Sequence, residues 1–237
     1  MKKEFLEISW KRYLLPPIHP EGIRVVLIMA CVVTLLGLLS SYIWVIGVPV
    51  LGFALYFFRN PERVPPEGDH LVLAPADGIV CAIREMVPPE TLNLGTDPLI
   101  RVSTFMSVFN VHVNRNPVSG MVCALKYHPG KFVNVAHKDS EDNERQEICV
   151  QKRNGTKIGY VQIAGLVARR IFCPLQVGQQ VKRGQVFGLI RFGSRLDVYL
   201  PKGVKPLVEL GQTMVAIKFP PNAGRVMQNS FSSSLTG

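Results

Sequence analysis

The sequence lacks the cysteine spacing that builds metal or disulfide sites. No C-x-x-C pair occurs, and the cysteines are odd in number: Cys31, Cys81, Cys123, Cys149 and Cys173. Structural zinc sites and disulfide frameworks need paired, regularly spaced cysteines. The chain therefore offers neither a zinc site nor a disulfide scaffold, and we expect no metal ion in its function.

Charge is absent from residues 25–58, an apolar run bounded by Arg24 and Arg59. A single membrane helix needs ~20 apolar residues, so this longer run predicts either a helical hairpin that turns near residues 38–43 or one strongly tilted helix. No convincing small-residue cleavage site supports a secretory signal peptide. We therefore expect a membrane anchor at residues 25–58, after a basic N-terminal segment at residues 1–24.

Positive charge lies on both sides of this apolar run. Lys and Arg flank membrane segments on the cytoplasmic side, which favours the inner membrane, with both ends of the run and the residues after it on the cytoplasmic side. The basic flanking residues are Lys2, Lys3, Lys11, Arg12, Arg24, Arg59 and Arg63.

The chain also lacks a nucleic-acid-binding motif, although its net charge of +10 and pI near 9.6 would suit one. The basic residues are spread along the chain, and neither zinc-finger spacing nor an aromatic RNA-binding motif occurs. Each Lys or Arg near an anionic bilayer contributes ~1 kcal/mol of attraction. We therefore expect anionic membrane lipid as a partner and no nucleic acid.

Long helical patterns are missing after the apolar run. Residues 59–70 are proline-rich and predict an extended linker. Residues 71–220 contain short β-branched runs separated by Gly, Pro and Asn, which predicts a β-rich domain, all-β or α+β. The polar residues 221–237 predict a flexible tail.

Two segments of this β-rich region resemble the halves of a biotinyl/lipoyl-type barrel-sandwich domain. Residues 74–80, APADGIV, resemble its opening turn, and residues 177–188, VGQQVKRGQVFG, resemble its second half. The glycines suit turns with positive φ or close backbone approach. The resemblance implies a flattened β-sandwich with a hairpin at Gly193-Ser194. No lysine lies in an acceptor turn, which argues against a carrier role.

Three chemically capable positions are unremarkable when each is taken alone. Gly193 interrupts a strand pattern, which indicates a bulge or tight bend, and the Ser194 hydroxyl could reach the preceding carbonyl there. The simpler interpretation is a bulge with an exposed serine. His112 by itself is typical of a half-buried structural histidine, and Asp77 is typical of a turn aspartate that bonds its own backbone.

Taken together, these stretches resemble the phosphatidylserine decarboxylase proenzymes, in their short form. Asp77 lies in Pro-Ala-Asp-Gly, His112 lies in Asn-Val-His-Val-Asn-Arg-Asn-Pro, and Ser194 follows Gly193. Residues 130–134, 143–145 and 165–171 are also family-like, and the similarity extends over about residues 59–219. Long-form members read Leu-Gly-Ser-Thr where this chain reads Phe-Gly-Ser-Arg.

The resemblance implies a pyruvoyl-dependent carboxy-lyase that converts phosphatidylserine to phosphatidylethanolamine after cleaving itself between Gly193 and Ser194. His112, held in one tautomer by Asp77, would take the proton of Ser194, which then becomes the pyruvoyl cofactor. The fragments, residues 1–193 and 194–237, would stay associated as a heterodimer that could oligomerise further.

The resemblance also raises two questions about binding and proton supply. Basic residues suit the lipid phosphate, and the candidates are Lys131, Arg169 and Arg170. Long-form members carry a second histidine where this chain has Phe109, so His128 or His137 could supply that role. Two alternatives stay open: a membrane-anchored barrel-sandwich adaptor without catalysis, and a decarboxylase of a soluble amino acid.

Overall fold

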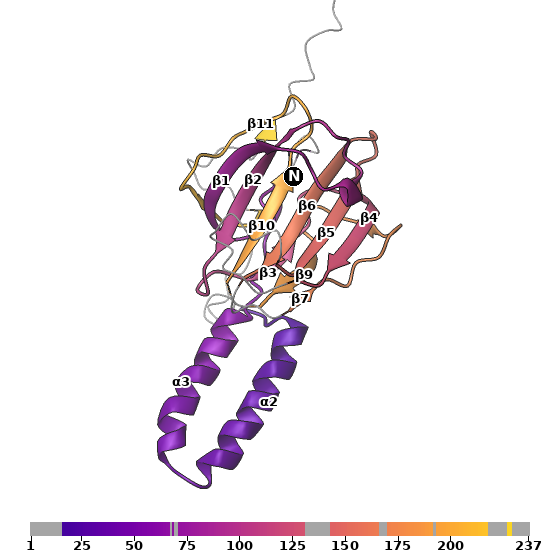
Figure 1. Cartoon of the computed structure of the whole chain (residues 1–237). Coiled ribbons are helices and arrows are strands. Elements are labelled where there is room, and N and C mark those ends of the chain that lie inside the picture. The colour runs from indigo at the N-terminus through magenta and orange to yellow at the C-terminus, as the bar shows by residue number, and fades with distance from the viewer. Residues whose placement is uncertain are drawn as a thin grey trace, which may run out of the picture. The chain divides into compact units, whose positions relative to one another are not determined.

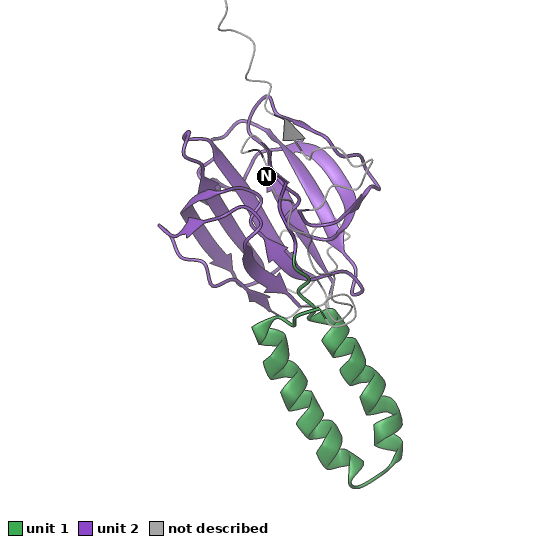
Figure 2. Cartoon of the chain, turned by 180° about the vertical axis from the view of Figure 1, so that it is seen from behind, with its two compact units in different colours: residues 1–62 green, residues 63–237 purple. Residues whose placement is uncertain are grey.

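The computed structural model describes residues 16–66, 68, 71–130, 143–165, 170–191, 193–217 and 227–228. The chain divides into two compact units, Met1–Glu62 and Arg63–Gly237 (Figure 2). Parts of the expected N-terminal segment, linker and tail lie outside the described residues. We describe each unit by itself.

The first unit is a pair of helices, α2 (Pro20–Gly37) and α3 (Tyr42–Phe57), joined by a short turn (Figure 1). The apolar run therefore forms a hairpin and not one tilted helix. Pro20 at the first helical position and the His19 side chain, which accepts from the Glu21 N–H, start α2. A Cβ on Gly47 would lie 2.5 Å from Val33 Cγ1, so the glycine lets the two helices approach closely.

The two helices differ in their ability to cross a bilayer. Among the described residues, α2, with 18 residues, is the one helix long and apolar enough for a span, while α3 has 16 residues and contains Pro49. Proline removes a helical hydrogen bond. Helices of these lengths reach ~24–27 Å at 1.5 Å per residue, slightly less than the ~30 Å hydrocarbon layer.

The second unit is built mainly of β-strands, which confirms the β-rich fold class. Its largest sheet has eight strands in the order β12-β1-β2-β10-β6-β5-β4-β8 and curls strongly (Figure 1). All neighbours in it are antiparallel. The strands are β1 (Gly78–Met86), β2 (Leu99–Met106), β4 (Gly120–His128), β5 (Arg145–Gln151), β6 (Lys157–Ala164), β8 (Gln180–Val181), β10 (Ser194–Tyr199) and β12 (Thr213–Met214).

Two smaller sheets complete the unit. A three-stranded sheet has the order β3-β9-β7, and a two-stranded sheet pairs β11 with β13. A short 3₁₀ helix, η1 (Glu90–Leu92), lies between β1 and β2. The strands are β3 (Val113–Arg115), β7 (Ile171–Phe172), β9 (Val186–Ile190), β11 (Lys205–Pro206) and β13 (Met227–Gln228).

The main hydrophobic core joins the eight-stranded sheet to the three-stranded sheet. Residues alternate between the two faces of a strand, and in β10 Leu196 and Val198 enter this core while Tyr199 joins a second cluster. Large members of the main core are Val102, Met106, Tyr160, Phe187, Ile190, Leu196 and Val198. The inner face of β10 is therefore buried in this core.

The glycines of residues 177–188 adopt the conformations expected of them. Gly178 and Gly184 have φ of 86° and 83° in turns on either side of β8. A Cβ on Gly188 would lie 2.5 Å from the Phe172 carbonyl oxygen, so this glycine permits close strand approach. The predictions of positive φ and close backbone approach are both confirmed here.

Candidate active site

Ser194 begins β10 and is fully buried. Its cross-strand neighbours are Met106 of β2 and Ala164 of β6, both members of the main core. Leu196, two residues later, points into the same core, so the Ser194 side chain lies on the core face too. Among the described residues, the Ser194 Oγ has no hydrogen-bond partner. Buried hydroxyls nearly always have partners, and Ser194, which follows a glycine with positive φ, is therefore a candidate reactive group.

Gly193 lies where the chain crosses from one sheet to another. β9 belongs to the three-stranded sheet and β10 to the eight-stranded sheet, so the two strands do not pair and the expected hairpin is wrong. Gly193 has φ of 59°, which glycine adopts without the steric cost of a side chain. Its carbonyl oxygen accepts a hydrogen bond of 3.0 Å from the Gly165 N–H. The Gly-Ser bond thus follows a sharp bend.

His112 is fully buried just before β3. Its Nδ1 lies 3.0 Å from the carbonyl oxygen of Asn110. A carbonyl only accepts, so this contact assigns the proton to Nδ1 and the lone pair to Nε2. The His112 carbonyl in turn accepts from the Ile190 N–H at 3.4 Å. His112 therefore lies beside the segment that leads from β9 to Gly193.

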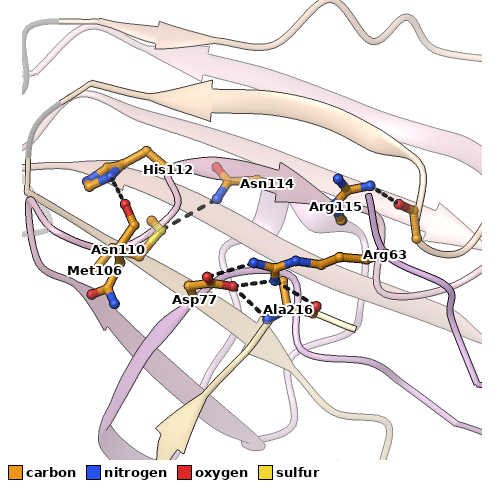
Figure 3. Close-up of polar contacts among 9 residues, drawn as sticks. Arg63, Asp77, Met106, Asn110, His112, Asn114, Arg115 and Ala216 are labelled. Atoms are coloured by element: carbon orange, nitrogen blue, oxygen red, sulfur yellow. Dashed lines mark hydrogen bonds and ion pairs between the residues drawn. The ribbon is translucent and has the colours of Figure 1, made fainter. Parts of the chain in front are cut away.

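Asn114 connects the His112 strand to the sheet that carries Ser194. Its Nδ2 donates to Met106 Sδ at 3.6 Å, and its Oδ1 accepts from Gln162 Nε2 at 2.8 Å. Met106 is the direct neighbour of Ser194 across the sheet. Figure 3 shows His112 and Asn114 along one stretch of chain and the contact between Asn114 and Met106. Asn114, two residues after His112, therefore links this strand to the strand that neighbours Ser194.

Asp77 contacts a different partner from the one expected. Arg63 donates to both carboxylate oxygens, with an Nη2–Oδ2 distance of 2.7 Å, and the Ala216 N–H donates to Oδ1 at 2.8 Å. Figure 3 shows the Asp77 side chain turned to Arg63. Among the described contacts no bond joins Asp77 to His112. Asp77 is thus held by Arg63 and Ala216, and its expected role in orienting His112 stays a prediction.

The Pro-Ala-Asp-Gly turn nevertheless supports the His112 strand through its backbone. The Pro75 carbonyl accepts from the Arg115 N–H at 2.9 Å, and Arg115 Nη1 donates to the Gly184 carbonyl at 3.0 Å. Burial lowers the pKa of Arg115, the nearby Arg63 lowers it further, and Asp77 raises it. Arg63 thus pairs directly with Asp77, and the buried Arg115 lies close enough to be influenced by both charges.

The Arg63–Asp77 pair supports a stability prediction. Their side chains are 5% and 11% exposed, and removing one member of a buried ion pair costs about 3–5 kcal/mol because the other charge is left uncompensated. We expect Arg63→Ala to lower the melting temperature of the detergent-solubilised chain clearly. The exposed Arg84→Ala is the matched control and should leave it nearly unchanged. Equal melting temperatures for both variants would contradict a structural role for Arg63.

The other sequence candidates are dispersed. His128 Nε2 lies 3.2 Å from the carboxylate of the buried Glu147. Across the sheet, His128 of β4 is in register with Arg195 of β10, and strands β5 and β6 lie between them. At about 4.8 Å per strand that separation is about 14 Å, so His128 does not replace the missing second histidine beside Ser194.

Arg170 is exposed, and its carbonyl accepts from the Arg191 N–H at 3.3 Å. Lys131, Arg169 and His137 lie outside the described residues.

The sequence assigned no site role to Arg63 or to Gly165. Arg63 lies in the stretch predicted to be a plain linker, and its Arg-Val-Pro-Pro context gives no sign of a buried partner. Gly165 lay in a family-like stretch, but the hydrogen bond that its backbone N–H donates could not be predicted, because every residue except proline has such a group. Within the described part of the chain, no group of three or more His, Cys, Asp or Glu residues could hold a metal ion.

The buried serine that follows a bent glycine, the buried histidine bonded to Ile190 and the enclosing sheets are features of an enzyme rather than an adaptor. The family model for phosphatidylserine decarboxylase matches residues 50–219, most of the chain. The chain therefore belongs to the phosphatidylserine decarboxylase family.

Individual relatives are similar to this chain over most of their lengths, and each of those compared is a phosphatidylserine decarboxylase proenzyme. The protein of Ruegeria pomeroyi is 52% identical over 203 residues, covering 85% of this chain and 93% of the relative. That of Granulibacter bethesdensis is 53% identical over 210 residues, covering 87% and 85%. That of Cereibacter sphaeroides is 50% identical over 201 residues, covering 84% and 87%.

Proposed function

We propose that this protein is a self-processing decarboxylase that converts phosphatidylserine to phosphatidylethanolamine, using a pyruvoyl group made from its own Ser194. The observation that carries the proposal is the buried Ser194 Oγ, which has no hydrogen-bond partner among the described residues and directly follows the bent Gly193. Membership of the phosphatidylserine decarboxylase family supplies the substrate class. The chain would be cut between Gly193 and Ser194.

The position of Ser194 suits such a group. A pyruvoyl group is small and uncharged, and residue 194 lies on the buried core face between Met106 and Ala164. When formed, the group supplies an electron sink for the loss of the substrate carboxyl group. The enclosing strands would limit the access of water to the reacting atoms.

His112 is proposed as the proton-transfer residue. Its Nδ1 contact with the Asn110 carbonyl leaves the lone pair on Nε2, which is the atom required to accept the Ser194 hydroxyl proton. Histidine changes its protonation near neutral pH, so the same ring could later return a proton to the product. Asp77 is proposed as a positioning residue that acts through the turn bonded to β3, because its carboxylate is held by Arg63 and Ala216.

Arg170 is our proposed partner for the lipid phosphate, together with Lys131 and Arg169. The Arg170 side chain is exposed, and its backbone is bonded to Arg191, two residues before Gly193. A guanidinium group binds phosphate with paired hydrogen bonds. The phosphate of a bound head group could therefore lie close to the reacting carbon.

The two fragments are proposed to remain together as a heterodimer. β10 would belong to the shorter fragment, yet it lies between β2 and β6, which belong to the longer one. All six residues of β10 are buried. Separation would expose these side chains and break two ladders of hydrogen bonds, so the cut chain should stay associated and could assemble further.

The helical hairpin is proposed to anchor the protein in the inner membrane, with the catalytic unit on the cytoplasmic side. Exposing a buried CH₂ of a lipid to water costs ~0.8 kcal/mol, so a diacyl substrate is best processed at the bilayer surface.

The alternative function, a membrane-anchored adaptor without catalysis, has no comparable support. Described residues between 80 and 177 form strands and one three-residue helix, without the long helical hairpin that adaptors carry.

The proposed substrate can be tested with lipid vesicles. We expect the purified protein to release carbon dioxide from vesicles that contain phosphatidylserine and to form an equal amount of phosphatidylethanolamine. Free serine is the control for a soluble substrate and should give no carbon dioxide. Release from free serine but not from vesicles would overturn the lipid assignment.

A further inference from the structure

The carbonyl at the proposed cleavage point already has a fixed hydrogen-bond donor. The Gly165 N–H donates to the Gly193 oxygen at 3.0 Å. This bond lies just beyond the β6–β10 ladder, in which Ala164 is opposite Ser194. We propose that the Gly165 N–H stabilises the oxyanion formed during self-cleavage and that Glu144 is the positioning residue for this donor. The inference rests on the proposed function.

The chemistry explains why a donor is needed at this oxygen. The Ser194 Oγ loses its proton to His112 and bonds to the Gly193 carbonyl carbon, so the carbonyl π electrons move to the oxygen. The C–N bond then breaks, and the nitrogen takes the proton from His112. An ester replaces the amide, with no atom gained or lost. Negative charge develops only on the Gly193 oxygen, which is the atom that Gly165 contacts.

A backbone donor at this position favours the transition state over the starting amide. A hydrogen bond to an ionised oxygen is roughly twice as strong as one to a neutral carbonyl. Its strength increases further where water is excluded, and Ser194 is completely buried. The donor is also fixed in advance, because neighbouring strands hold both backbones in register.

Glu144 holds the segment that contains Gly165 at both ends. Its backbone carbonyl accepts from the Ala164 N–H at 2.9 Å, and its Oε1 accepts from the Ile171 N–H at 3.1 Å. The Tyr127 hydroxyl donates to the same Oε1 at 3.0 Å. Partial burial and this contact raise the pKa of Tyr127. Glu144 itself is 3% exposed, as expected of a fixed structural contact.

The donor can be removed by one substitution with a matched control. Gly165→Pro eliminates the N–H, whereas Gly165→Ala retains it. We expect Gly165→Pro to slow self-cleavage by about 100- to 1000-fold, the usual effect of losing one oxyanion donor, and Gly165→Ala to cleave within a few-fold of the unaltered chain. The measurement is the rate at which the full-length band disappears on a denaturing gel.

Two further measurements separate this role from a general disturbance of the fold. In an uncleavable Ser194→Ala background, Gly165→Pro should melt within a few degrees of its parent. The cleavage rate of Gly165→Pro should also be lower by one constant factor at every pH, because the proton-transfer residue is unchanged. A melting temperature far below the parent, or a shifted pH profile, would overturn the assignment.

Glu144→Ala provides a second route that leaves the Gly165 N–H in place. Misplacing a reacting group by ~1 Å can cost ~100-fold, so we expect cleavage to slow by about tenfold or more, with Glu144→Gln in between. Normal cleavage by both Gly165→Pro and Glu144→Ala would overturn the inference and leave the proposed function intact. An unaltered chain that never cleaves would instead refute the proposed function.

Discussion

Replacing Ser194 with alanine is expected to leave the chain in one piece and to abolish the decarboxylation of phosphatidylserine. Alanine has no oxygen to attack the Gly193 carbonyl, and it cannot become a pyruvoyl group. The loss should be complete in both assays. Since the Ser194 Oγ has no described hydrogen-bond partner, the substitution should leave the melting temperature nearly unchanged.

Ser103 offers a matched control for this experiment. It is also a fully buried serine whose Oγ has no partner among the described residues, but it lies opposite Asp197 rather than at the cleavage point. Ser103→Ala should therefore cleave and decarboxylate normally. Cleavage of Ser194→Ala at the same bond would refute the assignment of Ser194.

Replacing His112 with alanine is expected to slow self-cleavage by about 100- to 10,000-fold, the usual contribution of a positioned acid–base residue. His112 is buried beside the segment that precedes Gly193, and its Nδ1 contact leaves Nε2 as the basic atom. The measurement is the cleavage rate at neutral pH. Any cleaved material should also decarboxylate slowly, because the product needs a returned proton.

His128→Ala is the control for His112→Ala. His128 pairs with Glu147, and strands β5 and β6 separate its strand from β10. The His128 variant should therefore cleave at a rate within a few-fold of that of the unaltered chain. A slow His128 variant and a normal His112 variant would mean that the proton-transfer residue has been misassigned. Melting temperatures of both variants should be recorded, because removing a buried imidazole also costs packing.

Local patterns in the sequence predicted much of the fold. The charge-free run at residues 25–58 gave the helical hairpin as one of two options, and Leu38 to Ser41 form its turn. The short β-branched runs gave a β-rich unit, and the turns at Gly178 and Gly184 follow from glycine spacing. Each of these features depends on residues close together in the chain, where periodicity and turn chemistry act.

Pairing between distant strands could not be predicted in the same way. Alternating runs on both sides of Gly193 resemble a hairpin, yet β10 pairs with β2 and β6. The choice of partner depends on how the whole core packs, which no local pattern contains. The same limit explains Asp77, because its partner Arg63 lies in a proline-rich stretch whose contacts form only in the folded unit.

Arg195, where long-form members have threonine, has a structural explanation. It lies on the outer face of β10 and binds Asp197 through Nε at 2.9 Å and Nη2 at 3.1 Å. Arg101 of β2 lies 3.6 Å from the same carboxylate. These buried charges connect β10 to its neighbour just after the proposed cleavage point. They would help to hold the new end of the shorter fragment in place.

The central claim is that Ser194 changes chemically after the chain is cut, and the intact mass of the C-terminal fragment tests it most directly. The account predicts a fragment of residues 194–237 that is lighter by one ammonia than the same peptide beginning with serine. Carbon dioxide release from phosphatidylserine should increase in proportion to that fragment. An active protein that stays uncut, or a fragment with an ordinary N-terminal serine, would contradict the account.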